Sequence, residues 1–339
     1  MSLMARGHLP GPVVLASVLL AASACLWLLG AAVGSSGFES LANVHRDGQA
    51  LLIVLDIRLP RTLGAWLAGA LLGLAGAVAQ GLFRNPLADP YLLGSASGAA
   101  LAVASAMALF GSSPFAGAWL AQLGLTGAAF VGAVAAVLLT LLLAKGVQHT
   151  LRLLLAGVVV GVVLGAITSL VLLVNPDTLQ TMQSFMLGST SFVGWAACGL
   201  MALTFCVCLT AAWMMSHVLD GLALGEATAQ SLGLQLPRMR AALIAVLALA
   251  TGCAVAQTGL IAFVGLAAPH LARSVVKTTH GQLVVLSSLV GAVLLTGADI
   301  LARWLVAPQE LPVGVLTAVL GGGYLLWLMH RQAARGTAL

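Results

Sequence analysis

The chain has 339 residues, of which 61% are hydrophobic and only 7% are charged. Soluble domains carry roughly 25% charged residues, so the composition excludes that class and favours an all-α integral membrane protein. The net charge of +5 comes from 14 Lys and Arg against 9 Asp and Glu, scattered singly through apolar sequence. Such scattering makes no basic face, so no nucleic-acid partner is expected.

Apolar stretches recur along the whole chain. They lie at about residues 12–33, 60–82, 91–110, 118–144, 152–174, 195–216, 240–260, 265–276, 282–302 and 312–329. A helix that spans hydrocarbon needs about 20 apolar residues, so these stretches predict about ten transmembrane helices. The stretch at 265–276 is too short to cross alone and is interpreted as a short span after a break at Gly259 to Gly265. Because no linker or low-complexity segment divides residues 1–339, a single transmembrane domain is expected.

The basic residues predict the orientation of the chain in the membrane. An even number of spans puts both termini on one side, and Lys and Arg are enriched in cytoplasmic segments. Placing the termini in the cytoplasm leaves Arg46, Arg58, Arg61 and Arg303 outside and the other ten of the 14 Lys and Arg inside. The bias therefore favours cytoplasmic N and C termini.

Glycines recur four or three residues apart within two of the spans. Small residues at this spacing let helix backbones approach closely in a membrane bundle. We expect such packing at Gly69, Gly73 and Gly76, and at Gly157, Gly161 and Gly165. The alternative is that glycine is simply common in membrane helices.

The segment from Arg84 to Pro90 interrupts two apolar spans with two prolines. Each proline removes a backbone donor and disfavours helix in the residue before it. Broken backbone at membrane depth is tolerated only where protein or a water-filled cavity receives the freed groups. The segment either borders a transport pathway or forms a tight cytoplasmic turn, and this feature alone does not decide between them.

A polar interval runs from about Ser216 to Arg240. Its Glu226-Ala227-Thr228-Ala229 core favours a short helix, Gly233 is a good stop, and Pro237 bars continuation. A short cytoplasmic helix between spans is a candidate docking surface for a soluble partner. The alternative is a helix that merely completes a loop.

The chain lacks the motifs of an energy-coupling or catalytic protein. A phosphate-binding P-loop needs Gly before its lysine, but Lys145 follows Ala144 and Lys277 follows Val276. No nucleophile elbow, zincin motif or metal-ligand spacing of His and Cys is present. We therefore expect no metal site, no catalytic residues and no cofactor on this chain.

Several segments together resemble the FecCD-type permeases, the transmembrane subunits of ABC importers for iron chelates, haem and cobalamin. The matching segments, in the order in which the family has them, are Arg58-Leu59-Pro60-Arg61, residues 80–90, Leu93-Gly94, Arg152 to Gly157, Phe263 to Arg273, Asp299 to Arg303, and Glu310 to Gly314. Each segment alone is weak evidence, whereas all of them in order are specific and cover nearly the whole chain.

The resemblance implies a type II ABC importer permease of ten helices in the bacterial inner membrane. A second copy would pair with it along the transport pathway, and two separate ATPase subunits carrying ATP and Mg would dock on the cytoplasmic face. A periplasmic binding protein would deliver a ferric siderophore, haem or cobalamin. The chain itself would be a transport subunit and not an enzyme.

The resemblance also implies roles for individual residues. Docking of the binding protein is carried over to Arg58, Arg61 and Arg303, which the charge count places outside on independent grounds. Coupling to the ATPase is carried over to cytoplasmic coupling helices at about 217–238, with Gly225, Glu226, Ala227, Leu232 and Gly233. The cytoplasmic gate is carried over to Asn85, Leu87, Thr150 and Leu151.

The cargo pathway is assigned to polar and Met residues that follow the fifth span. Met182, Gln183 and Met186 are the candidates, and the two methionines share a face if they lie on one helix. The alternative for the methionine pair is core packing.

Two other classes of protein compete with the ABC importer. An ion-coupled secondary transporter should carry an ionisable residue near mid-membrane. Asp299 is the best candidate, yet Arg303 lies four residues on and can pair with it on one helical face. An intramembrane enzyme would need a catalytic constellation, and the sequence offers none.

Overall fold

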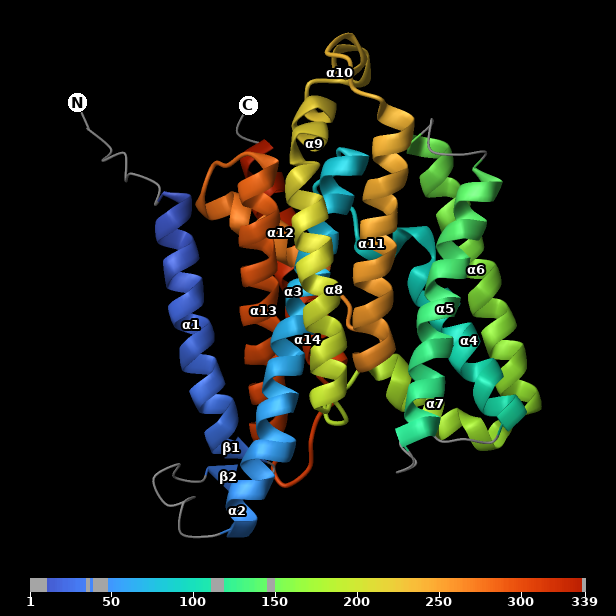
Figure 1. Ribbon diagram of the computed structural model, residues 1–339, viewed down its shortest axis with the longest axis vertical. Coiled ribbons are helices and arrows are strands. Elements are labelled where there is room, and N and C mark those ends of the chain that lie inside the picture. Colours follow the sequence, from blue (N-terminus) through green and yellow to red (C-terminus); the bar gives the residue numbers. More distant parts are fainter. Residues whose placement is uncertain (1–10, 35–36, 39–47, 111–118, 145–149, 337–339) are drawn as a thin grey trace.

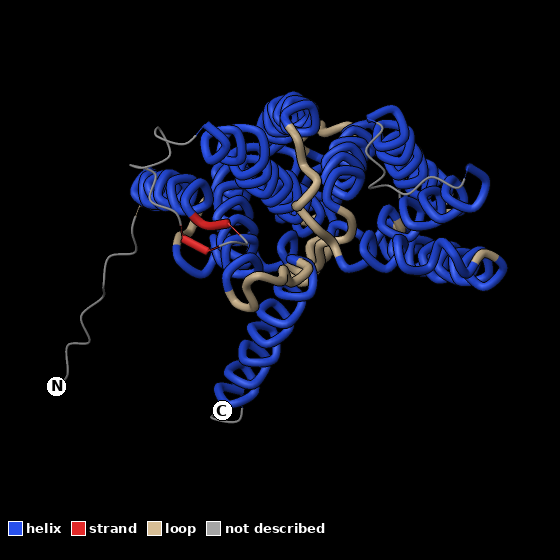
Figure 2. Tube along the Cα trace, turned by 90° about the horizontal axis from the view of Figure 1, so that it is seen from below, coloured by secondary structure: helices blue, strands red, loops and turns tan. Residues whose placement is uncertain are grey.

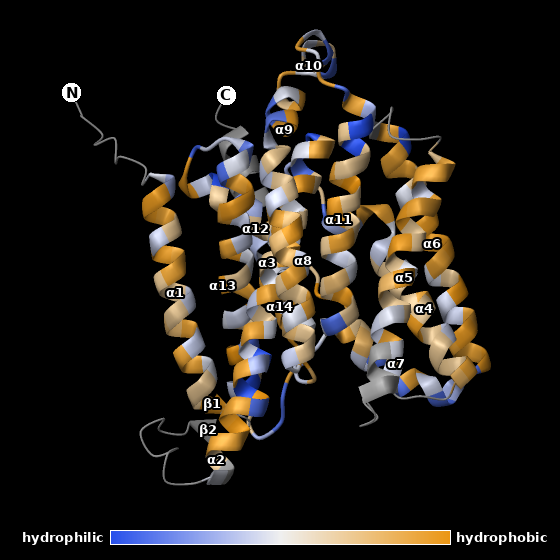
Figure 3. Cartoon of the chain, viewed as in Figure 1, coloured by the Kyte–Doolittle hydropathy of each residue, from blue (hydrophilic) through white to orange (hydrophobic). Residues whose placement is uncertain are grey.

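The computed structural model describes residues 11–34, 37–38, 48–110, 119–144 and 150–336 of the chain. Arg46 and Lys145 lie outside these residues. The described helices run up and down between the two ends of one bundle (Figure 1). Hydrophilic residues gather mainly toward the two ends, while the middle of the helices is largely hydrophobic (Figure 3).

Seven helical segments of the described residues are long and apolar enough to cross a membrane. They contain α1 (Pro12–Ala32), α3 (Leu59–Phe83), α5 (Trp119–Leu143), α6 (Thr150–Val174), α8 (Trp195–Met214), α11 (Leu236–Thr258) and α13 (His280–Trp304). The segment of α3 begins earlier, in α2 (Gly48–Ile53), and passes through a π-helical turn at Val54–Arg58. The fold is therefore that of an all-α membrane protein.

Three further apolar stretches of the sequence lie on shorter or partly apolar helices. These are α4 (Ser95–Phe110), α12 (Val264–Val275) and α14 (Val313–Gly336). Every predicted apolar stretch thus lies on a helix. Because only seven segments have the length and hydropathy of a span, the number of ten crossings stays a prediction.

The remaining elements lie at or near the ends of the bundle, except the turn at Pro90–Leu93, which packs inside it against Gly265. They are a two-residue hairpin of β1 (Val33–Gly34) and β2 (Gly37–Phe38), α7 (Leu179–Leu187), α9 (Ser216–Ala223), α10 (Glu226–Ser231), and 3-10 turns at Pro90–Leu93 and Pro176–Thr178. The start of α1, the short helix α10 and the end of α14 lie at the same end, and the hairpin lies at the opposite end (Figure 1). This arrangement agrees with termini and predicted coupling helices on one side.

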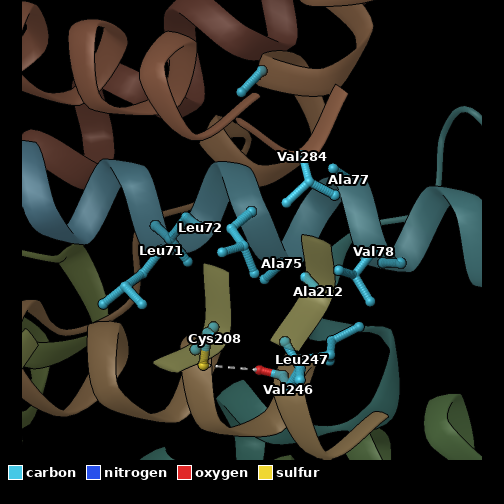
Figure 4. Close-up of a cluster of buried hydrophobic side chains, with 14 of the residues drawn as sticks. Leu71, Leu72, Ala75, Ala77, Val78, Cys208, Ala212, Val246, Leu247 and Val284 are labelled. Atoms are coloured by element: carbon cyan, nitrogen blue, oxygen red, sulfur yellow. Dashed lines mark hydrogen bonds between the residues drawn. The ribbon is translucent and has the colours of Figure 1, made fainter. Parts of the chain in front are cut away.

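Helix α3 is the centre of the bundle. Nearly all of its side chains are buried, and its most extensive packing is against α13. Figure 4 shows the apolar core around it, where Leu71 and Leu72 of α3 lie near Cys208 of α8 and Leu247 of α11. The Cys208 thiol donates to the carbonyl of Val246 at 3.7 Å.

Glycines bring α3 into backbone contact with its neighbours. A Cβ added at Gly69 would lie 2.3 Å from the carbonyl oxygen of Gly291, and one at Gly73 would lie 2.1 Å from that of Ser287. At Gly76 the corresponding distance, to the Gly265 oxygen, is 1.7 Å. The predicted packing role of these three glycines is therefore confirmed.

The second glycine set behaves differently along its length. A Cβ at Gly157 would lie 2.1 Å from the Leu92 oxygen, which confirms close packing there. At Gly161 the nearest atom, Ser97 Oγ, is 3.7 Å away, and at Gly165 nothing lies within 4 Å. The prediction is wrong for these two positions within this chain, because no backbone of another element lies within 4 Å of a Cβ added at either of them.

The break predicted at Gly259 to Gly265 is present. Helix α11 ends at Thr258, Gly259 has a φ of 69°, and α12 begins at Val264. Phe263 before it also has a φ of 69°, which is unusual for a bulky residue. A Cβ at Gly321 of α14 would lie 2.4 Å from the Cβ of Phe263, so α14 reaches the bundle closely at this point. Beyond it, α14 leans away from the other helices (Figure 2).

Candidate functional site

The end of the bundle that carries α10 presents an exposed tip. Figure 1 shows α10 as its outermost helix, above α9 and between α8 and α11. Gly225 and Gly233, with φ of 108° and 81°, bracket the helix and allow the chain to turn on both sides. Leu224 and Leu232 are 67% and 64% exposed, and Ala227 is exposed as well. The short helix predicted around residues 226–229 is confirmed, and it offers an apolar surface to a partner.

One predicted coupling residue of the tip points inward. The carboxylate of Glu226 lies 2.6 Å from Nη2 of Arg240 and 3.8 Å from Nη2 of Arg84. Arg240 is buried at the start of α11, and Arg84 directly follows α3. Asp220 of α9 makes a separate connection to His280 of α13, with Oδ1 2.7 Å from Nδ1 and 3.0 Å from the backbone N–H that donates to it. The tip is therefore attached by polar side-chain contacts to α11, to α13 and to the residue that follows α3.

The segment after α3 is an exposed turn. Arg84 adopts the left-handed conformation with a φ of 50°, and the N–H of Asn85 donates to the carbonyl of Gln80 at 3.2 Å. The Asn85 side-chain oxygen accepts from the N–H of Leu87 at 2.9 Å, and Leu87 is 51% exposed. Asn85 thus shapes the turn that holds Leu87 outward.

The second pair of predicted gate residues lies at the start of α6. Thr150 is the first residue of that helix, but its side chain lies outside the described part of the chain. Leu151 is 71% exposed. The end of α3 and the start of α6 both lie toward the end of the bundle that carries α10 (Figure 1).

The opposite end holds a buried ionic network centred on Asp299. Its Oδ1 accepts from Nε and Nη2 of Arg61 at 3.2 and 3.1 Å and from the hydroxyl of Thr190 at 2.5 Å. Its Oδ2 accepts from Arg303 one turn along α13, which confirms the predicted pairing of these two residues. Asp299 is fully buried, and its two oxygens are occupied by two guanidinium groups.

Arg61 and Arg303 also bind groups outside this carboxylate. Nη1 of Arg61 donates to both carboxylate oxygens of Glu310 at 2.8 and 2.9 Å, and Glu310 also accepts from the hydroxyl of Ser191 at 3.1 Å. Arg303 donates to the hydroxyl of Thr62 at 3.2 Å and to the carbonyls of Gly30 and Val33 at 3.1 and 3.2 Å. The network therefore joins α1, α3, α13 and the loop before α14.

The three arginines predicted to dock the binding protein are buried. Arg58, Arg61 and Arg303 are only 5%, 7% and 1% exposed. Nη1 of Arg58 donates to the carbonyls of Ala31 and Ala32 at 3.4 and 3.3 Å, at the end of α1. The charge count assigns these residues to the outer side of the membrane, but it does not predict the direction of their side chains. The side chains turn inward because carboxylates and helix-end carbonyls of the same chain accept their hydrogen bonds.

The predicted pathway residues share the short helix α7 but not one environment. Met182 is fully buried in an apolar cluster with residues of α4, α5 and α11, so it lines no pathway in this arrangement. Gln183 and Met186 are exposed. For Met182 the alternative interpretation, core packing, is therefore correct. The side chains of Gln183 and Met186 are accessible.

Three cavities in the described part of the chain are small. One of about 50 Å³ is lined by polar groups that include Thr126, Ser184, Ser189 and Gln257, and two apolar ones measure about 210 and 250 Å³. Binding pockets for drug-sized ligands enclose about 300–1,000 Å³. None of these three cavities has room for a bulky cargo within one copy.

Comparison with known proteins places this geometry in a family. The model of the FecCD transport family matches residues 15–331. The chain is 38% identical over 303 residues to the hemin transport system permease protein HmuU of Yersinia pestis, covering 88% of this chain and 89% of that protein. It is 40% identical over 285 residues to the vitamin B12 import system permease protein BtuC of Salmonella paratyphi A, covering 83% and 85%.

A solved structure gives the same assignment for the fold. It is described as an inward-facing conformation of a putative metal-chelate type ABC transporter, and it superimposes with a TM-score of 0.84 at 28% identity. The match covers 94% of this chain and 99% of that one. The family match over most of the sequence and the shared fold agree, and the chain belongs to the FecCD transport family.

Proposed function

We propose that this chain is the membrane subunit of an ATP-driven importer in the bacterial inner membrane, taking an iron chelate or cobalamin into the cytoplasm. The observation that carries the proposal is the family match over residues 15–331. The names of two relatives, a hemin and a vitamin B12 permease, support this range of cargo without selecting within it. The sequence carries no P-loop of its own, so ATP hydrolysis is assigned to separate subunits.

The tip of α9 and α10 is assigned to the contact with those ATPase subunits. Its exposed Leu224 and Leu232 support this assignment, since exposed apolar side chains at a polar end of a membrane protein suit a protein partner. Asn85, Leu87, Thr150 and Leu151 are assigned to the cytoplasmic gate at the same end. A second copy is assigned to the opposite side of the pathway, and the size of the three cavities measured above, each below that of a pocket for a bulky ligand, supports this assignment.

The periplasmic binding protein is assigned to the end of the bundle that carries the Asp299 network. Arg61 is the docking arginine closest to the surface, and it is paired with Glu310, whose side chain is 27% exposed. A carboxylate of the binding protein must therefore compete with Glu310 for Arg61. Arg58 and Arg303 would act by holding α1 and α13 in place below this surface.

Transport by the assembled complex tests the proposal. The chain is co-purified with its ATPase subunit, reconstituted into sealed vesicles and supplied with the loaded binding protein. Uptake should require ATP and should stop when the Walker lysine of the ATPase subunit is replaced, because that lysine holds the nucleotide phosphates. Uptake that continues with an ion gradient and no ATP would instead support a secondary transporter.

A further inference from the structure

We propose that Glu226 is a positioning residue that mechanically joins the ATPase-docking tip to the cytoplasmic gate. The inference rests on the proposed function, and it concerns how movement passes through this chain. A single carboxylate oxygen of Glu226 faces Arg240 at 2.6 Å and Arg84 at 3.8 Å. We call these three residues the fork.

The two arms of the fork lead to different parts of the membrane domain. Arg240 lies near the start of α11 and is 4% exposed, so this arm connects α10 to a helix inside the bundle. Arg84 is the residue immediately before Asn85, so the other arm ends at the turn that carries Leu87. The fork therefore reaches both a membrane helix and the gate from the outermost helix of the tip.

The backbone around α10 transmits movement poorly by itself. The helix has six residues, and glycines with positive φ stand before and after it, at Gly225 and Gly233. The backbone at a glycine is flexible because glycine can adopt a wide range of φ and ψ angles. A helix of six residues also has little stability of its own. Within the helix only Ala229 is buried. An ionic side-chain connection is thus the direct route for a displacement of α10 to reach α3 and α11.

The arms also differ in strength. The Glu226–Arg240 pair is short and has one buried partner, whereas the Arg84 side chain is 45% exposed and its contact is long. Exposed ion pairs are weak and buried ones resist separation. The Arg240 arm is therefore the permanent attachment, and the Arg84 arm can open and close as the gate moves.

The conformation of Arg84 fits a switching role. Non-glycine residues with positive φ are uncommon and cluster where the surrounding structure enforces them. Arg84 has a φ of 50°, and its N–H donates to the carbonyls of Gln80 and Gly81 at the end of α3. A pull on its side chain acts directly on this strained turn, which sets the direction of residues 85–87.

The base of the tip is attached independently of the fork. Asp220 of α9 contacts His280 at the start of α13, and this pair shares no atom with Glu226. Removing the charge of Glu226 should therefore leave the tip folded and able to bind the ATPase subunit. What should be lost is the transfer of its movement to the gate.

The experiment compares transport per ATP hydrolysed in the reconstituted complex. Glu226→Gln keeps the shape of the side chain but removes its charge, and we expect cargo moved per ATP to fall by about tenfold while ATPase binding and hydrolysis persist. Arg84→Gln should also lower the cargo moved per ATP. Arg84→Lys keeps the positive charge, so it should retain most of the native value of cargo moved per ATP. Lys277→Gln is the matched control, since Lys277 is an exposed basic residue between α12 and α13 and lies outside the coupling segment at 217–238.

The outcomes separate the fork from simpler roles. If Glu226→Gln and Arg84→Gln both keep the native ratio, or if Glu226→Gln lowers ATPase binding as Leu232→Glu should, the fork is overturned. If Glu226→Gln does not fold, judged by size-exclusion chromatography, Arg84→Gln and its lysine counterpart still decide the question. Failure of the native chain to bind an ATPase subunit would reject the proposed function itself, which is a different result.

Discussion

Replacing Asp299 with asparagine is expected to destabilise the protein more than any other single loss of charge in the described chain. The change removes the negative charge that Arg61 and Arg303 share, while the two guanidinium groups stay buried. Removing one partner of a buried ion pair costs about 3–5 kcal/mol of unfolding free energy. The loss should appear as a lower unfolding temperature in detergent and a lower yield of monodisperse protein.

Asp177 offers the matched control for this substitution. It is exposed in the turn before α7, so Asp177→Asn should change the unfolding free energy by less than about 0.5 kcal/mol. Equal unfolding temperatures for Asp299→Asn and the native chain would contradict the structural role of the network. A folded Asp299→Asn protein that had lost ion-driven uptake would point to the secondary transporter, in which this carboxylate carries a proton.

Gly291→Ala is the second substitution with a large expected effect. The added Cβ would lie 2.2 Å from the carbonyl oxygen of Gly69 and 3.1 Å from the Cα of Gly73, both in the backbone of α3. No flexible side chain can move aside, so α13 and α3 must separate along their main contact. Overpacking of this kind costs about 1–3 kcal/mol, and a backbone clash belongs at the upper end.

A glycine of the same helix serves as the control. Nothing lies within 4 Å of a Cβ added at Gly297, so Gly297→Ala should leave stability unchanged or raise it through the better helix propensity of alanine. Thermal unfolding of the two variants in the same detergent makes the comparison. If both behave alike, the close approach of α3 and α13 does not contribute to stability as argued.

The local features of this fold are readable from its sequence. Apolar runs, the break after Gly259 and the short helix before Gly233 depend on residues adjacent in the chain, and the structure has all of them. The pairing of Asp299 with Arg303 was predictable for the same reason, because residues four apart share a helical face.

The contacts that define the candidate sites were not predictable in this way. Arg61 and Asp299 are separated by 238 positions, and nothing in either local sequence indicates that they meet. A count of basic residues predicts on which side of the membrane a segment lies, but it does not predict whether a given side chain faces solvent. Glu226 shows the same limit, since its neighbours suggested a docking surface while its carboxylate turns toward Arg240.

The internal neutralisation of the arginines has a consequence for encounter kinetics. Arg61 and Arg303 are matched by Asp299 and Glu310, so these four groups together carry no net charge at this end of the bundle. Long-range steering depends on net potential and is screened over about 10 Å at 0.1 M salt. An acidic partner should therefore associate at a rate that changes little with ionic strength. Stopped-flow association across a salt series would show a shallow slope, and Glu310→Gln would make it steeper by uncovering one positive charge.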